Sequence, residues 1–227
     1  MFLKNYPAMK IGRTLVIADL HLGITKDIYD RGILLPNQTA MLANEINKLK
    51  KTTRTSRLVI LGDIKHKVPG ISFQEMRDVP KFLSSLKYRE IIIVKGNHDG
   101  GIEKIVKGNE NVKVRKFMTI NDYYLTHGHR NAKTAKKTII IGHNQPHVRF
   151  RDDMGARYTE PVWVRGALIG KKKLIIMPAF NRLCGATIVN KDELLGPVAK
   201  KLIKSRTHVY LLDGTDIGTI KDLTIDK

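Results

Sequence analysis

Five stretches of the chain run as short apolar segments and then end on residues whose side chains can bind a metal ion. These residues are Asp19 and His21, Asp63, Asn97 with His98 and Asp99, His127, and His143. Carboxylates and imidazoles with one carboxamide suit divalent Mn, Fe or Zn better than Ca or Mg, which prefer shells made of oxygen. Cys184 is the only cysteine, so the sequence excludes a cysteine-based site.

Asp63 directly follows Gly62 and is suited to bridge two ions. Two ions about 3.5–4 Å apart can hold both the attacking and the leaving oxygen of an in-line displacement at phosphorus. The ligand types therefore predict hydrolysis of a phosphoester.

The five apolar runs are rich in β-branched residues, which is typical of buried strands in an α/β sheet. They cover residues 15–18, 58–61, 91–94, 123–125 and 139–141. In such sheets, ligands gather beyond the carboxyl ends of the strands. We therefore expect the five loops that follow to converge on one point, whatever their spacing along the chain.

Further patterns predict the elements around these strands. We expect a hairpin over residues 9–18, helices near 38–50, 73–86 and 197–204, and a short helix that ends at 106. Other strands are expected near 112–114, 117–120, 157–159, 162–165, 174–177 and 208–212. Helices early and strands late predict two sheets face to face with helices outside. The length suits one α/β domain over residues 1–227.

The ordered blocks of the chain resemble a known family. Asp19-Leu20-His21, Gly62-Asp63, Gly96-Asn97-His98-Asp99, His127-Gly128 and Gly142-His143 resemble the five blocks of the calcineurin-like metallophosphoesterases. Residues 19–23, 35–38, 62–66 and 178–181 resemble the branch related to SbcD-type DNA exonuclease subunits. The resemblance covers roughly residues 10 to 185. It implies a four-layer αββα sandwich of two mostly parallel or mixed sheets flanked by helices.

The resemblance also implies a role for each matched residue. The first metal would be held by Asp19, His21 and Asp63, and the second by Asp63, Asn97, His127 and His143. His98 would be the catalytic imidazole, and Asp99 would orient its ring. A hydroxide that bridges the two ions would attack phosphorus.

The last block departs from the family pattern, which reads Gly-His-any-His. Here Gln145 stands at the position of the second histidine. Its amide oxygen is a weaker donor than imidazole, so the first site should bind more loosely and favour Mn or Mg. His147 could replace it only if the loop took another course, which the fixed φ of Pro146 disfavours. His66, His129 and His147 remain candidates for outer or alternative ligands.

The net charge of +20, from 41 basic residues against 21 acidic ones, predicts a polyanionic partner. Basic residues expected around the metal site are Arg130, Lys133, Lys136, Lys137, Arg149, Arg151 and Arg157. They favour nucleic acid as the partner. Aromatic residues do not alternate with them, so we expect no sequence-specific recognition.

Three functions remain open on this sequence. The favoured one is a nuclease or phosphodiesterase with two divalent ions, Mn above Mg, Fe or Zn. The others are a phosphoesterase for small nucleotides or generic esters, and a non-catalytic scaffold whose metal site has degenerated. No apolar run of about 20 residues predicts a membrane span, and the amino terminus does not resemble a signal peptide. We expect a cytoplasmic protein without a membrane partner, of undetermined oligomeric state.

Overall fold

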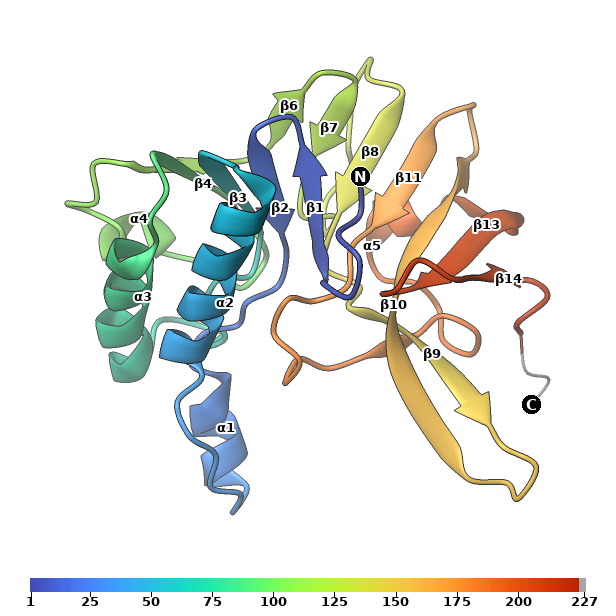
Figure 1. Cartoon of the computed structure of the whole chain (residues 1–227), viewed down its shortest axis with the longest axis horizontal. Coiled ribbons are helices and arrows are strands. Elements are labelled where there is room, and N and C mark those ends of the chain that lie inside the picture. Colours follow the sequence, from blue (N-terminus) through green and yellow to red (C-terminus); the bar gives the residue numbers. More distant parts are fainter. Residues whose placement is uncertain (225–227) are drawn as a thin grey trace.

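The computed structural model describes residues 1–224 and contains two β-sheets packed face to face (Figure 1). The first sheet has the strand order β1-β2-β3-β4-β5. Its strands are β1 (Ala8–Ile11), β2 (Thr14–Ile17), β3 (Arg57–Leu61), β4 (Glu90–Val94) and β5 (Val112–Arg115). Strands β2 to β5 are parallel, and β1 forms the predicted antiparallel hairpin with β2.

Four helices accompany the first sheet, and the longer ones cover its outer face (Figure 1). They are α1 (Ile24–Asp30), α2 (Thr39–Thr53), α3 (Phe73–Ser85) and α4 (Ile102–Ile105). The helical spacing of Leu42, Ile46 and Leu49 turns one side of α2 into a core shared with α3 and the sheet. A reciprocal capping box between Ser72 and Glu75 begins α3.

The second sheet contains nine strands in the order β12-β9-β10-β11-β8-β7-β6, with β13 paired to β10 and β14. They are β6 (Met118–Ile120), β7 (Tyr123–Leu125), β8 (Thr138–Ile141), β9 (Pro146–Arg151), β10 (Arg157–Leu168), β11 (Lys173–Ile176), β12 (Thr187–Ile188), β13 (Leu202–Leu211) and β14 (Asp216–Thr219). The adjacent strands β7, β8 and β11 are parallel.

Apolar side chains fill three layers of the molecule. One core lies between the first sheet and its helices, and a second lies between the two sheets around Trp163. The third covers the outer face of the second sheet and includes Val198 and Ala199 of the short helix α5 (Gly196–Ala199). The predicted four-layer α/β sandwich is confirmed. Within residues 1–224, no helix is long and apolar enough to cross a membrane.

Three predicted elements differ from the structure. The helix expected over 197–204 is wrong beyond Ala199, because the chain from Leu202 extends as β13 and pairs along β10. Burial of Thr207 and Val209 with exposure of His208 between them is the alternation of a strand. The two short strands expected at 157–165 form the single strand β10. Neither α1 nor β9 was expected.

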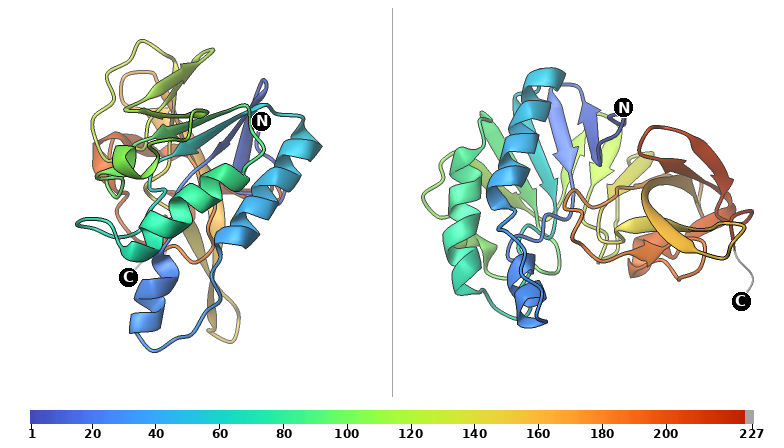
Figure 2. Two further views of the ribbon diagram at one scale, coloured as in Figure 1. Left: turned by 90° about the vertical axis from the view of Figure 1, so that its left-hand side faces the viewer. Right: turned by 60° about the horizontal axis from the view of Figure 1, so that its bottom comes forward.

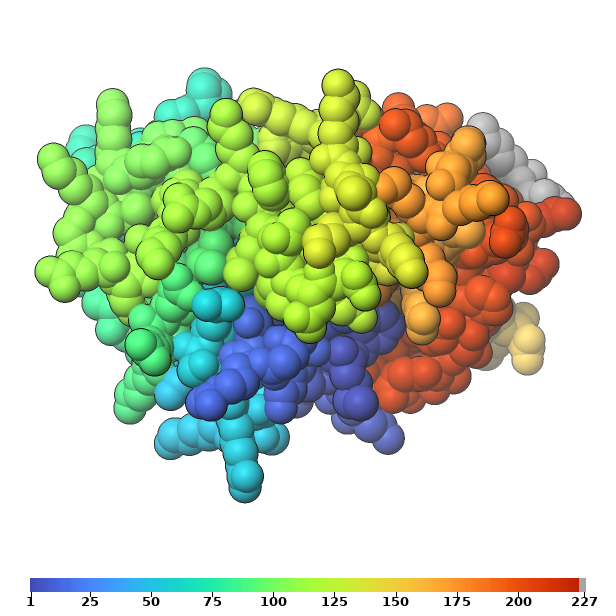
Figure 3. Space-filling view, turned by 90° about the horizontal axis from the view of Figure 1, so that it is seen from above, coloured from blue at the N-terminus to red at the C-terminus, as the bar shows by residue number. Residues whose placement is uncertain are grey.

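Two parts of the chain project beyond the carboxyl ends of the parallel strands. Helix α1 and the β9–β10 hairpin both extend past the carboxyl ends of the strands, at the bottom of Figure 1 and in the two views of Figure 2. The opposite edge, where the parallel strands begin, is viewed from above in Figure 3.

Candidate metal centre

The loops after β2, β3, β4, β7 and β8 converge at the carboxyl ends of the strands, as the sequence predicts. Backbone hydrogen bonds tie the loops to one another. The N–H of His21 donates to the carbonyl of Asp63 (2.8 Å), and that of Gly142 donates to the carbonyl of His127 (3.1 Å). The first bond joins two loops of the first sheet, and the second joins two loops of the second sheet. The ligand-type side chains therefore sit on a connected frame.

Asp63 lies at the middle of the cluster. Its Oδ2 is 3.1 Å from Nε2 of His127 and 3.7 Å from Nε2 of His21. Three groups have ligand atoms that all lie within 4.8 Å of one another: His21 with His66 and His98, Asp19 with His21 and Asp63, and Asp63 with His127 and His143. The two groups that contain Asp63 share its carboxylate, which is the geometry that a pair of bridged cations requires.

Two amide side chains complete the surroundings of these groups. Oδ1 of Asn97 lies 3.1 Å from Nε2 of His127. Nε2 of Gln145 lies 2.9 Å from Nε2 of His21, and rotating this amide by 180° would put its oxygen there instead. Nδ1 of His147 contacts the carbonyl of Gln145 (3.0 Å).

The backbone is left-handed at five of the predicted ligand residues. Their φ angles are 54° at Asp19, 43° at His21, 49° at Asp63, 67° at His143 and 46° at Gln145. Such a conformation costs of order 1–3 kcal/mol at a residue with a side chain and is concentrated at functional sites. Strain at five residues of one cluster indicates that the fold is constrained by a function there.

Three glycines of the motifs allow the side chains to approach closely. A Cβ on Gly62 would lie 2.0 Å from Nδ1 of His127, and one on Gly96 would lie 2.0 Å from Oδ1 of Asp63. A Cβ on Gly142 would lie 2.6 Å from Oδ2 of Asp19. Each glycine thus makes room for a ligand-type side chain that another loop supplies.

Burial and neighbouring charges shift the protonation of the cluster. Burial raises the pKa of Asp19 to about 7, whereas it lowers the pKa of His21 to about 3. Burial opposes a charge on His127, but the hydrogen bond to Asp63 and the charge of Asp19 prevail and raise its pKa to about 9. A proton on His127 thus balances the buried carboxylates. A divalent cation between these groups would supply the same positive charge and displace that proton.

A family comparison agrees with this geometry. The model of the calcineurin-like phosphoesterase family matches residues 12–175, well over half of the 227 residues. The chain belongs to the calcineurin-like phosphoesterases. Members of this family are metal-dependent hydrolases of phosphoesters, and the grouped Asp and His side chains are positioned for metal binding.

Two solved structures are similar to this phosphoesterase, and the first of them shares its fold. The nuclease MPE of Pseudomonas putida matches with a TM-score of 0.58 and 20% identity, over 88% of this chain and 85% of that one. The phosphoesterase YfcE from E. coli matches with a TM-score of 0.45 and 14% identity, over 94% of this chain and 99% of that one. Among curated proteins, no sequence matches the chain at a significant level.

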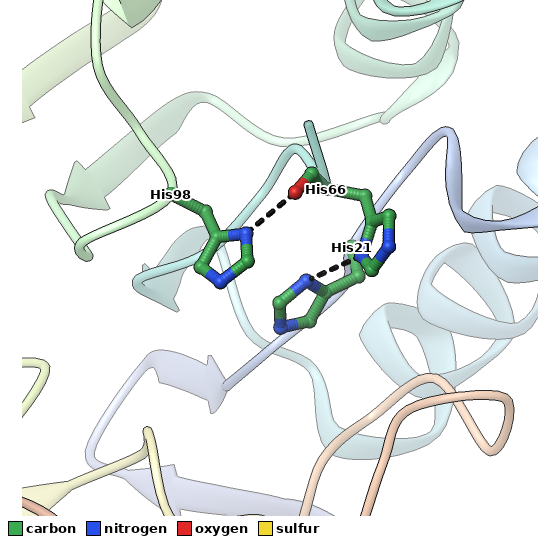
Figure 4. A group of neighbouring side chains, drawn as sticks. All are labelled: His21, His66 and His98. Carbon is green, nitrogen blue, oxygen red and sulfur yellow. Dashed lines mark hydrogen bonds between the residues drawn. The ribbon is translucent and has the colours of Figure 1, made fainter. Parts of the chain in front are cut away.

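Two further histidines of the phosphoesterase lie beside His21 (Figure 4). His66 Nδ1 is 3.2 Å from His21 Nδ1, and its other ring nitrogen is 3.1 Å from Oδ2 of Asp27. The ring of His98 lies across that of His21, with centroids 4.7 Å apart. Nδ1 of His98 donates to the carbonyl of His66 (2.5 Å), so its Nε2 points away from that carbonyl.

Asp99 does not contact the ring of His98, in contrast to the expectation from the sequence. Its buried carboxylate accepts hydrogen bonds from the backbone N–H groups of Gly96 (2.8 Å), Asp63 (2.9 Å) and Ile64 (2.9 Å). Asp99 therefore fixes the loops after β3 and β4. Because the N–H of His98 donates to Oδ1 of Asp63 (2.8 Å), this loop geometry also orients the shared carboxylate.

His129 lies near the second group of ligands. Its ring centroid is 5.3 Å from that of His127 and 6.2 Å from that of His143. Its buried Nδ1 has no hydrogen-bond partner within residues 1–224. Burial and the charge of His127 lower the pKa of His129 to about 4. A neutral imidazole whose Nδ1 has no partner could accept a hydrogen bond from a group bound to a cation at this centre.

The sequence pointed less clearly to two residues that support the site. Asp27 on α1 holds His66, and nothing in its sequence context distinguishes it from a surface residue. Glu75 is buried, and its Oε1 accepts from the N–H groups of His66 (2.8 Å) and Lys67 (2.5 Å). Its signal was the Ser-x-x-Glu spacing from Ser72, which marks a helix start.

The basic residues do not all surround the metal centre. The expectation is wrong for Lys136 and Lys137, because they precede Thr138, which begins β8 opposite the start of β7. This edge lies on the face seen in Figure 3, where the yellow-green segment before β8 is exposed. Arg130 is close enough to lower the pKa of His129, after burial and His127. Arg149 and Arg151 belong to β9, which begins directly after Gln145.

Proposed function

We propose that this phosphoesterase is a phosphodiesterase that hydrolyses nucleic acid with two divalent cations, Mn by preference. The observation that carries the proposal is the pair of ligand groups that share Asp63. Asp19, His21, Asp63 and Gln145 would hold the first ion, and Asp63, Asn97, His127 and His143 the second. A shell of imidazole, carboxylate and carboxamide supports a first-row cation, and the neutral Gln145 favours Mn over Zn at the first position.

The surroundings of the cluster fit such ions. The carboxylates of Asp19 and Asp63 are both almost fully buried, and neither has a lysine or arginine partner within residues 1–224. Buried carboxylates require positive charge nearby, which cations would supply. Nδ1 of His127 donates to the carbonyl of Leu61 (3.0 Å), which leaves Nε2 directed at Asp63. This is the tautomer that a metal-binding histidine needs.

The chain's own groups would orient the substrate and move the proton. When bound, two cations would lower the pKa of a water molecule and stabilise charge on the phosphoryl oxygens. His98 holds a proton on Nδ1 against the carbonyl of His66, and its Nε2 is the free position on the ring. We assign His98 the task of general acid: with a second proton on Nε2, it would give that proton to the leaving oxygen and keep the one on Nδ1. The carboxylate of Asp99 accepts hydrogen bonds from the backbone of Asp63 and Gly96, and these bonds hold His98 at a fixed position relative to Asp63.

Nucleic acid is favoured over a small ester by the charge of the chain. The excess of basic residues produces a net charge of +20. Arg130 stands next to His129, and Arg149 follows the loop of Gln145 along β9. A nuclease is also among the solved structures with this fold. Phosphate contacts of this kind position a backbone without reading its bases.

Metal analysis and hydrolysis assays on one preparation test the proposal. We expect up to two Mn per chain, and faster hydrolysis of oligonucleotides and of bis-p-nitrophenyl phosphate than of p-nitrophenyl phosphate, a monoester. Preference for the monoester, with no cleavage of DNA or RNA, would indicate a phosphoesterase for small substrates. Absence of bound metal and of all turnover after incubation with Mn would leave a scaffold without activity.

A further inference from the structure

The β9–β10 hairpin extends from the metal centre as a two-stranded arm (Figures 1 and 2). We call residues 146–161 the arm. Its first strand begins at Pro146, next to Gln145, whose amide lies 2.9 Å from His21. In its register, Arg151 is opposite Arg157, Phe150 is opposite Tyr158, and Arg149 is opposite Thr159. The arm thus starts at the ligands and leads away from them.

The two faces of the arm differ in chemistry, because side chains alternate along each strand. Val148, Phe150 and Tyr158 lie on one face, which joins the outer core of the second sheet. The rings of Phe150 and Tyr158 stack with centroids 5.2 Å apart and hold the two strands together. The other face carries Arg149, Arg151 and Arg157, and we call it the arginine face.

The arginine face is electrostatically unfavourable by itself. Arg151 is directly across from Arg157, and like charges in this position destabilise a strand pair. None of the three arginines forms an ion pair within residues 1–224. A polyanion on this face would relieve the repulsion.

The acidic residues of the arm do not neutralise this face. Asp152 and Asp153 belong to the turn, where Oδ1 of Asp152 accepts from the N–H groups of Met154 (3.0 Å) and Ala156 (2.8 Å). Glu160 shares its face with Tyr158. Three acidic and three basic residues make the arm neutral as a whole, so the segregation of the arginines matters more than their number.

The arginine face is directed to the side of the molecule that carries the first sheet. Along β10, Arg157, Thr159, Pro161 and Trp163 alternate onto the same side of the strand. Trp163 belongs to the core between the two sheets, whereas its neighbours Val162 and Val164 belong to the outer core. The inner face of the second sheet, which packs against the first sheet, therefore continues along β10 as the arginine face. This face extends past the loops that carry the predicted metal ligands.

We propose that the arginine face binds the sugar-phosphate backbone of nucleic acid and guides it to the metal centre. This inference rests on the proposed function, because it names the surface that holds the same substrate. Guanidinium groups pair with phosphates through two parallel hydrogen bonds, which suits a rigid ladder of arginines. The face also carries His147 and Thr159, but its three guanidinium groups make phosphate the group it suits, and contacts to phosphate carry no sequence information. Binding is thus independent of base sequence.

The test is a triple variant, Arg149→Gln, Arg151→Gln and Arg157→Gln, in the full chain. Its matched control, Arg13→Gln, Arg89→Gln and Lys173→Gln, removes the same charge at the opposite edge of the sheets. Binding of labelled single- and double-stranded DNA is measured in EDTA across a series of salt concentrations. The arm variant should bind more weakly and lose roughly 0.7–0.9 in the salt slope for each phosphate contact. The control should stay close to the natural protein.

Several results would overturn the proposal. Equal losses in both variants would show that total charge, not the arm, attracts DNA. Equally tight binding of poly-glutamate would show that the arginine face has no fit to a nucleic-acid backbone. Unchanged DNA binding by the arm variant, with normal cleavage by the natural protein, would refute the arm alone. If instead the natural protein binds DNA through the arm but hydrolyses neither DNA nor bis-p-nitrophenyl phosphate, the proposed function fails and the arm proposal stands.

Discussion

The two ends of the parallel strands carry polar residues of different kinds. At the carboxyl end, Asp19 and Asp63 are buried among histidines on a strained backbone. At the amino end, Arg13, Arg89 and Lys113 line an open surface pocket of about 580 Å³. This pocket contains none of the predicted metal ligands. Burial of charge and backbone strain therefore locate the chemistry of this fold better than the size of a pocket does.

The charged residues at the amino end form ion pairs that are partly exposed to solvent. Glu90 accepts from Arg57 (2.6 Å) and Lys113 (2.8 Å), and each of these side chains is partly exposed. Such pairs contribute little, because water screens them. At the carboxyl end, burial opposes a charge on His127, yet the hydrogen bond to Asp63 and the charge of Asp19 raise its pKa to about 9. Substitutions at the two ends should therefore differ greatly in effect.

The largest expected effect comes from Asp63→Asn. A neutral amide cannot bridge two cations as a carboxylate does, so hydrolysis of bis-p-nitrophenyl phosphate with Mn should be abolished while the fold persists. Glu90→Gln is the matched substitution at the amino end and should keep its activity. Steady-state rates and circular dichroism on both variants provide the measurement. Turnover close to the natural rate in Asp63→Asn would contradict the shared carboxylate.

His98→Ala should have the next largest effect. Loss of a proton donor costs roughly 10²–10⁴-fold in turnover, while metal content should not change, because His98 is not among the proposed ligands. The exposed His208, paired with Asp216 at 2.9 Å, provides the control variant His208→Ala. Metal analysis beside the rate separates the two roles. If the variant loses an ion, His98 belongs to the ligand shell.

Gln145→His should change metal binding more than the rate. The left-handed backbone at Gln145 and the fixed φ of Pro146 keep the side chain directed at His21, so the new imidazole should strengthen the first site. Metal content should rise toward two per chain when Mn is limiting. His147→Ala should be nearly silent. The reverse pattern, with metal lost in His147→Ala only, would identify His147 as the ligand.

The sequence was sufficient to predict that the ligand-type side chains lie together, but not to predict how the neighbouring residues are arranged. The apolar runs before Asp19, Asp63 and His143 identified strands whose carboxyl ends meet, since that rule depends only on parallel pairing. The role of Asp99 was missed, because backbone hydrogen bonds between loops leave no trace in the residue pattern. Lys137 was misplaced because nearness in sequence to His127 was taken for nearness in space. The intervening segment runs the length of the sheet instead.

The arm shows a different limit of sequence reasoning. Residues 146–151 alternate apolar and polar side chains, which is a strand pattern, yet the short run next to a proline was not recognised. Aromatic residues were not expected among the basic ones, although Phe150 lies between Arg149 and Arg151. Only the cross-strand register shows that the aromatic and arginine side chains take opposite faces. Pairing partners along β10 cannot be read from local pattern alone.

The smallest expected effect is on stability at the amino end. Hydrogen bonds from Lys113 and then Arg57 lower the pKa of Glu90 below its usual value, 4.5. A carboxyl whose folded pKa is lowered stabilises the fold above its unfolded pKa, and this contribution is lost as pH falls through the folded pKa. Because the pair is exposed, Glu90→Gln should lower the free energy of unfolding at pH 7 by less than about 1 kcal/mol. Urea unfolding of both proteins at pH 7 and below pH 4.5 measures it, and the difference should shrink at the lower pH. A difference that persists unchanged in acid would mean that the side chain acts through packing, not charge.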